Sequence, residues 1–332
     1  MVSTDANFEL QVDGYETVLV LQACHGGPSH FVGTAGKCRF CGSDDPTGFR
    51  QKAHTIPEAL GNKWLFSRDE CDACNALFSR YDQALADVVA PILTLGATKG
   101  KGNRVRKTGR SHSRSKIRHS RDAQGKRSLR LGAALKDDEA IGRIDLETGH
   151  WVFEHPLPST PFRPRHAYKA LCKIGYALLP EDELGNFTKL REWLQDPDDG
   201  LDFTALPVSI RFGYIGNSPP IAAVTMLRRK NSEDMKPYMV MMVAIGSLSF
   251  TIDLMPDVLD HHIPPVINPT VDFQFKAVLQ GAGNEAMIIR YEHPVFLNWS
   301  KACLQPQPFS VLETTINPVT QVSRFRLRLR DP

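Results

Sequence analysis

The stretch CRFCGSDDPTGFRQKAHTIPEALGNKWLFSRDECDACN, residues 38–75, carries the most specific pattern in this chain. It begins and ends with a C-x-x-C pair, Cys38 with Cys41 and Cys71 with Cys74, and 29 residues separate the two pairs. Two such pairs can complete a closed tetrahedral shell of thiolates around one ion. The spacing therefore predicts a structural Zn²⁺ site. The alternative is two redox-active pairs, which would require a βαβ context that the flanking sequence lacks.

The residues around the second pair predict a strand, a loop and a helix. Phe49 to His54 is suited to a short strand, and Pro57 with Gly61 then forces a turn. After Cys74, apolar residues recur at helical spacing until Pro91, which predicts an amphipathic helix. A histidine thus stands at the end of a strand, between two pairs of metal-binding cysteines.

In these elements the chain resembles the HNH endonucleases, in particular their cysteine-rich branch. That branch carries C-x-x-C, then H-x-I-P-x-x-L-G, then E-C-x-x-C-N, and all three elements are present from Cys38 to Asn75. The combination is specific, whereas each element alone would be weak. The resemblance implies a zinc-stabilised ββα-metal domain over residues 35–95.

The resemblance also implies a reaction, the hydrolysis of a phosphodiester by water. His54 matches the general base that takes a proton from the water, and a divalent ion, Mg²⁺ or Mn²⁺, would stabilise the charge at phosphorus. Asn75 matches a family position that contributes to the catalytic metal site. The alternative for His54 is a structural hydrogen-bonding role, and the alternative for Asn75 is a helix N-cap.

One departure concerns the catalytic metal. Many HNH enzymes have Asp or Glu directly before the base, and this chain has Ala53. Another carboxylate must then complete the shell. Asp82, seven residues after Asn75 and on the same side of a helix, is the first candidate, and Glu70 is the second.

Positive charge is concentrated directly after the proposed nuclease. The whole chain has a formal net charge of +3, but Lys99 to Arg130 holds 13 Lys and Arg with one acid, Asp122. This segment has too few apolar residues for a core of its own. We expect it to bind the phosphates of DNA without reading sequence. A charged linker that meets an acidic protein is the alternative. The candidate contacts are Arg104, Arg106, Lys107, Arg110, Arg114, Lys116 and Arg118.

The C-terminal half predicts a larger α+β domain with a helical hairpin and a mostly antiparallel sheet. Residues 166–179 and 181–194 have helical apolar patterns, and six later segments have strand patterns. The expected strands are 208–215, 221–227, 238–252, 273–279, 287–291 and 325–329. The expected organisation is an N-terminal extension at 1–34, the nuclease domain at 35–95, a basic arm or linker at 96–132 and the α+β domain at 133–332.

Composition limits the function further. The 332 residues are 42% hydrophobic and 23% charged, as in globular proteins, and no apolar run is long enough to span a membrane. A cytoplasmic location is therefore the expectation. A DNA endonuclease of low sequence specificity would need control, so we expect a defence effector against phage or plasmid, activated at its C-terminal domain by a nucleotide or an Argonaute-like partner. The alternatives are a non-catalytic zinc-stabilised nucleic-acid-binding protein and a protein-interaction scaffold.

Overall fold

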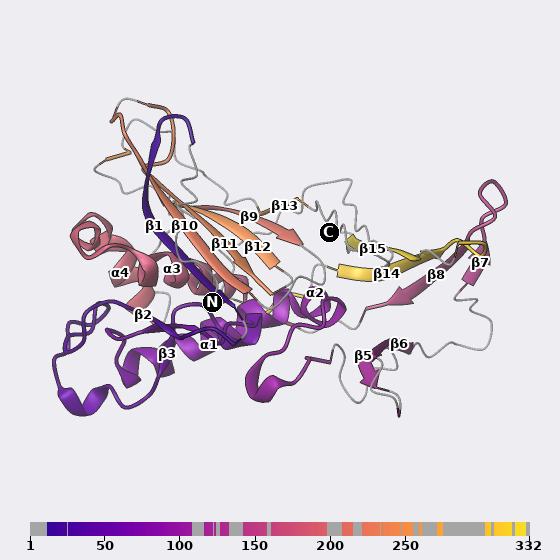
Figure 1. The fold of residues 1–332 in the computed structure, drawn as a ribbon, viewed down its shortest axis with the longest axis horizontal. Helices are drawn as coiled ribbons and strands as arrows, with labels where there is room; N and C mark the ends of the chain where they lie inside the picture. The colour runs from indigo at the N-terminus through magenta and orange to yellow at the C-terminus, as the bar shows by residue number, and fades with distance from the viewer. Residues whose placement is uncertain are drawn as a thin grey trace.

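We describe the fold from a computed structural model (Figure 1). None of the helices it describes is both long and apolar enough to cross a membrane. The structure describes residues 12–24, 26–107, 116–121, 123, 127–132, 142–157, 161–197, 208–214, 221–232, 234–246, 248–254, 259–260, 271–274, 303–306, 309–320 and 323–329.

Three short strands form a small sheet beside the cysteine pairs. β2 (His30–Val32) runs parallel to β4 (Leu65–Ser67), and β3 (Ala53–His54) runs antiparallel to it on the other side. Between β3 and β4 the chain passes through a 3-10 turn, η2 (Glu58–Leu60). Gly61 ends that turn at φ +104°, a conformation that glycine adopts without strain. Of the strand expected over Phe49 to His54, only Ala53 and His54 form one.

Helix α1 (Asp72–Val88) follows the second cysteine pair. Cys71 is its N-cap, so Asn75 lies inside the first turn and the N-cap interpretation of Asn75 is wrong. Apolar side chains three or four residues apart form its buried face. They include Phe78, Tyr81, Leu85 and Val88. Val89 is both the C-cap of α1 and the N-cap of a short helix, α2 (Ala90–Leu95), which has a proline in its first turn.

A six-stranded sheet forms the largest layer of the molecule. All its neighbouring strands are antiparallel except one parallel pair, β13 with β9. Its order is β1 (Tyr15–Cys24), β10 (Ile221–Arg229), β11 (Met239–Ile245), β12 (Leu248–Leu254), β9 (Val208–Tyr214) and β13 (Val271–Gln274). The N-terminal segment expected as an extension thus contributes β1, and the expected strand 238–252 is two strands joined by a turn. The expected strand 287–291 lies outside the described residues.

The predicted helical hairpin lies between this sheet and the cysteine-rich region. It consists of α3 (Pro164–Leu178), a 3-10 segment η4 (Glu181–Phe187) and α4 (Thr188–Gln195) (Figure 1). On one side α3 packs along α1, and on the other it packs on β12. Gly175 permits the second contact, because a Cβ at this position would lie 3.3 Å from the Leu254 side chain.

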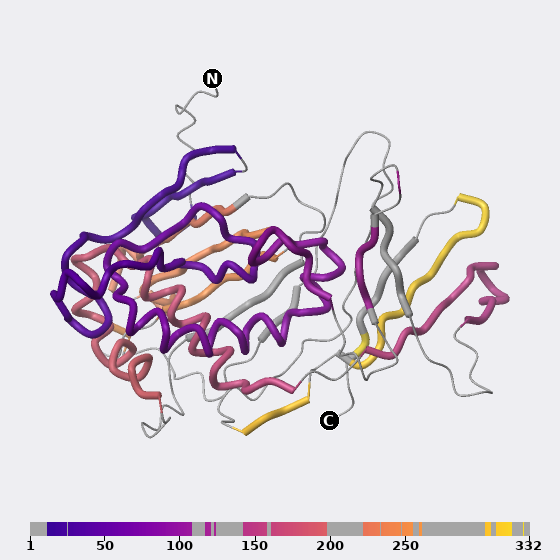
Figure 2. Tube along the Cα trace, turned by 90° about the horizontal axis from the view of Figure 1, so that it is seen from below, coloured from indigo at the N-terminus to yellow at the C-terminus, as the bar shows by residue number. Residues whose placement is uncertain are grey.

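A second sheet extends away from the cysteine-rich region, as Figures 1 and 2 both show. Its order is β15 (Ser323–Leu329), β14 (Phe309–Ile316), β8 (Trp151–Pro156) and β7 (Gly142–Ile144). The basic segment contributes a two-stranded hairpin, β5 (Lys116–Arg121) with β6 (Arg127–Gly132). The remaining 3-10 turns are η1 (Pro46–Gly48) and η3 (Lys101–Asn103).

The core crosses the boundaries expected from the sequence. Buried side chains form one continuous cluster that includes Phe40 and Tyr81 near the cysteines, Tyr176 on α3, and Met241 and Phe250 in the large sheet. The predicted α+β class is confirmed. The cysteine-rich region and the helical hairpin share one interior.

Candidate functional site

The two cysteine pairs converge on one point. The Sγ atoms of Cys38 and Cys74 are 3.8 Å apart, and those of Cys41 and Cys71 are 3.6 Å apart. All four sulfurs lie within 4.8 Å of one another. Zn–S bonds of about 2.3 Å in a tetrahedron place the sulfurs roughly 3.8 Å apart. The cluster therefore has the geometry of a structural zinc site, as the spacing predicted.

Hydrogen-bond donors surround these sulfurs. The Cys71 amide donates to Cys38 Sγ at 3.5 Å, and Gln195 Nε2, at the end of α4, donates to Cys74 Sγ at 3.2 Å. The hydrogen bond between Cys38 and Cys74 is the main cause that lowers the pKa of Cys38, and the same contact raises the pKa of Cys74, so the pair favours one thiolate. Thiolate is the form that binds metal. Gln195 also links the cluster to the helical hairpin, more than 100 residues further along the chain.

His54 ends β3 and lies against an aromatic ring. Its imidazole is half-buried, 4.7 Å from the Phe66 ring between centroids. Burial is the main cause that lowers the pKa of His54 to about 4, with Glu58 acting in the opposite direction and Lys173 in the same one. The buried Nδ1 atom has no hydrogen-bond partner in the described structure. At neutral pH this imidazole is uncharged and can accept a proton.

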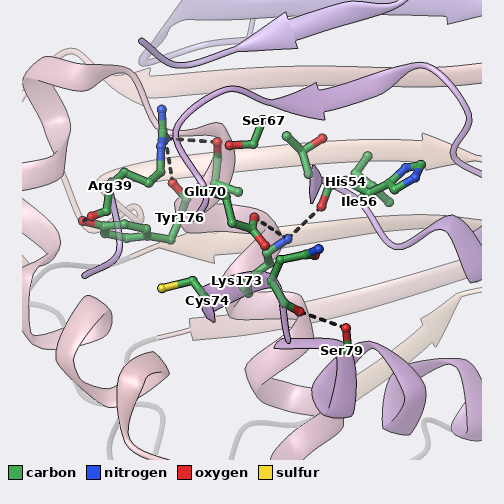
Figure 3. A network of polar contacts seen from close by, with 12 residues as sticks. Arg39, His54, Ile56, Ser67, Glu70, Cys74, Ser79, Lys173 and Tyr176 are labelled. Carbon is green, nitrogen blue, oxygen red and sulfur yellow. Dashed lines mark hydrogen bonds and ion pairs between the residues drawn. The ribbon is translucent and has the colours of Figure 1, made fainter. Parts of the chain in front are cut away.

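Lys173 of α3 fixes the backbone at His54. Its ammonium donates to the His54 carbonyl at 2.7 Å and pairs with Glu70 Oε2 at 2.9 Å (Figure 3). The side chains of Lys173 and Glu70 are 1% and 0% exposed. A residue of the C-terminal half is thus part of the structure that holds the candidate base.

Arg39, inside the first cysteine pair, makes a second buried connection to α3. Its Nε pairs with Asp69 at 2.7 Å, and its Nη1 donates to the carbonyls of Tyr176, Ala177 and Leu179 at 3.0 to 3.1 Å. These carbonyls belong to the end of α3, where backbone acceptors have no partner within the helix. Arg39 therefore caps α3.

Two of the expected ligands of the catalytic metal have hydrogen-bond or ion-pair partners in the structure. Glu70 pairs with Lys173, and Asn75 Nδ2 donates to Gln51 at 3.3 Å. Among the described residues, the four cysteines are the one group of three or more His, Cys, Asp or Glu whose ligand atoms converge. Ala53, directly before His54, is buried.

The two acidic candidates are nevertheless unusual. Burial is the main cause that raises the pKa of Glu70 to about 7 and that of Asp82 to about 6, whereas Lys173 lowers both. Asp82 Oδ1 and Glu70 Oε1 are buried with no hydrogen-bond partner in the described structure. Lys173 therefore acts on both carboxyl groups as well as on His54.

The expected contacts of the basic segment are distributed over a loop and a hairpin. Arg104 and Lys107 are exposed after α2, whereas Arg106 pairs with Asp87. Arg118 is exposed on β5, and the buried Ile117 beside it packs on α2. Arg110, Arg114 and the side chain of Lys116 lie outside the described residues.

Sequence reasoning missed Arg39 and Lys173. The sequence did contain a signal for Lys173. Lys169 and Lys173 lie one turn apart within a mostly apolar helical pattern, and both are buried in the structure. No comparable signal marks Arg39, because its partners at the end of α3 are about 140 residues away.

Comparison with known proteins agrees with this geometry. Residues 38–87 match the family model described as HNH endonuclease, so this segment is an HNH endonuclease domain. The match begins at the first zinc-site cysteine and ends within α1. No curated protein and no solved structure matches the chain.

Proposed function

We propose that the chain is a metal-dependent DNA endonuclease in which His54 is the general base. The observation that carries the proposal is the uncharged imidazole at the end of β3, inside the segment that matches the HNH endonucleases. Because the imidazole is uncharged, it can accept a proton. Because its side chain is only half-buried, it can reach a molecule bound at the surface.

In this reaction the imidazole of His54 takes a proton from water. The water oxygen forms a bond to phosphorus, and the bond from phosphorus to the 3′-oxygen breaks. The leaving oxygen takes up a proton from solvent. Lys173 supports the step indirectly, because its hydrogen bond holds the His54 carbonyl and with it the direction of β3.

A Mg²⁺ or Mn²⁺ ion is part of the proposal as the cofactor typical of HNH domains. The ion would stabilise the negative charge that develops at phosphorus. Asn75, Asp82 and Glu70 stay predicted ligands.

We further propose that the activity is controlled, as expected of an effector in defence against phage or plasmid, with DNA as the substrate. What supports control is the connection from α3 to the site: Lys173 contacts the His54 carbonyl, and Arg39 caps the helix. A nucleotide or protein that shifts α3 would move both contacts.

The second candidate is a non-catalytic zinc-stabilised DNA-binding protein. Ala53 favours it, because the acid that many HNH enzymes place before the base is missing. The exposed Arg104, Lys107 and Arg118 serve binding in either case. A protein-interaction scaffold would use the same cations on an acidic protein.

Plasmid cleavage tests the first proposal. Purified wild type with Mg²⁺ or Mn²⁺ is expected to nick or linearise supercoiled plasmid, whereas His54→Ala and a chelator control are not. His150→Ala, in the turn between β7 and β8, is the matched control and should cleave like wild type. Cleavage by His54→Ala at the wild-type rate would refute His54 as the base. DNA binding with no cleavage at any metal concentration, even with lysate of phage-infected cells, would favour the second candidate.

A further inference from the structure

An aromatic row crosses the small sheet and ends at His54. Phe31 on β2 and His54 on β3 both pair in register with Phe66 on the central strand. The ring centroids of Phe31 and Phe66 are 5.4 Å apart, in a stacked arrangement, and those of Phe66 and His54 are 4.7 Å apart. Phe66 is 7% exposed, but Phe31 is 39% exposed. Phe31 is therefore the exposed end of the row.

Two cations flank the row. The exposed Arg68 guanidinium lies over the Phe31 ring, 5.2 Å from its centroid, where it could stack with a base on that ring, and Lys52 Nζ lies over the Phe66 ring at 5.7 Å. Both side chains are exposed, and neither forms an ion pair within the described part of the chain. The neighbouring acids are already engaged, Asp69 by Arg39 and Glu70 by Lys173.

A cleft of about 430 Å³ opens beside this row. Its lining includes Phe31, Phe49, Arg50, Lys52 and Arg68. Two aromatic rings and three cations thus border one concave surface, next to the sheet that carries the candidate base. Its volume lies in the range of pockets that bind small ligands, roughly 300 to 1,000 Å³, which includes a single nucleotide.

We propose that this surface binds an unpaired nucleotide of DNA, with the base stacked on Phe31 and the flanking phosphates on Arg68 and Lys52. The inference rests on the proposed function and names its substrate class: single-stranded or locally unpaired DNA. In an intact duplex both faces of a base are covered by its neighbours, so an exposed ring gains a stacking partner only from an unpaired base. Phosphate binding alone would require the cations but not the ring.

Fluorescence anisotropy tests the proposal without cleavage. Three labelled probes of equal length are compared with no added divalent ion: a thymidine oligonucleotide, a duplex, and an abasic strand that keeps sugar and phosphate. Phe31→Leu keeps apolar cover over Phe66 but removes the stacking ring. It is expected to weaken binding of the thymidine strand by about 5- to 100-fold, and to leave the abasic strand unchanged. Trp151→Leu, a 47% exposed ring on β8, is the matched control and should bind all three probes like wild type.

Arg68→Gln separates the charge from the ring. It is expected to weaken all three probes and to reduce the salt dependence of binding. Photocrosslinking of a 5-iodouracil strand to wild-type protein gives a readout that needs no variant, and the crosslinked peptide should contain Phe31.

Unchanged binding of the thymidine strand by Phe31→Leu would overturn the proposal. So would an equal loss on the abasic strand, or a crosslink confined to other peptides. These outcomes are distinguishable from failure of the proposed function. If the protein cleaves plasmid but its binding of the thymidine strand does not depend on Phe31, this inference alone is refuted. If binding depends on Phe31 but no cleavage occurs, the proposed nuclease activity alone is refuted.

Discussion

Lys173→Met tests whether the buried ammonium holds the site together. The substitution removes both contacts of Lys173 Nζ, to Glu70 at 2.9 Å and to the His54 carbonyl at 2.7 Å. At pH 8 it leaves a buried carboxylate without its cation, which costs about 3 to 5 kcal/mol in the free energy of unfolding. Once Glu70 is protonated, the main remaining loss is the hydrogen bond at His54, about 1 to 3 kcal/mol.

The pH dependence follows from the pKa of Glu70. Its folded value, about 7, lies above the ordinary 4.5 because of burial, so the folded state binds the proton more tightly. Its contribution to stability is therefore greatest below pH 4.5 and falls as the pH rises through 7. Lys173 lowers this pKa, so its removal raises the value further and the decline continues to higher pH. The variant should thus lose more stability at pH 8 than at pH 6.

Urea unfolding followed by circular dichroism at pH 6 and pH 8 measures both effects. Lys169→Met is the matched control, since Lys169 is equally buried one turn earlier and donates to the Asp196 carbonyl at 2.6 Å. Its cost should not follow the titration of Glu70. The double variant Lys173→Met with Glu70→Gln should recover most of the loss at pH 8, because the unpaired charge is gone. A Lys173→Met cost under about 1 kcal/mol at pH 8, or no recovery in the double variant, would refute this reasoning.

Three further predictions follow from the zinc cluster, the cap of α3 and the basic segment. Zinc removal by a chelator should lower the Tm, and added Zn²⁺ should restore it. If metal analysis shows that the zinc is gone and the Tm is unchanged, the site is not structural. Arg39→Met should cost about 3 to 5 kcal/mol in chemical unfolding because Asp69 stays buried without its partner, and wild-type stability would contradict the cap. On duplex DNA, log affinity falls as log salt concentration rises. Replacing Arg104, Lys107 and Arg118 each by Gln should make this fall less steep, by about 0.9 per lost phosphate contact. An unchanged slope would exclude these side chains as phosphate contacts.

Local patterns were enough to predict the elements around the cysteines. The spacing of Cys38, Cys41, Cys71 and Cys74 predicted one four-sulfur site because each C-x-x-C turn fixes its own two thiols, and the structure brings the pairs together. The helical hairpin was predicted from its apolar stripe. The two larger sheets were predicted only in part, since β1 of the six-stranded sheet and β14 of the four-stranded sheet went unrecognised. β1 joins β10 across some 200 residues.

Residues near each other in the chain were enough to predict the zinc site, the histidine at a strand end and the HNH endonuclease segment. Only the tertiary structure decided what surrounds that histidine. It placed Lys173 between Glu70 and the His54 carbonyl, and it put Phe31 beside Phe66. The physical reason is that such contacts depend on which faces of distant elements pack together. The period of the apolar residues fixes which face is buried, but not what lies opposite it.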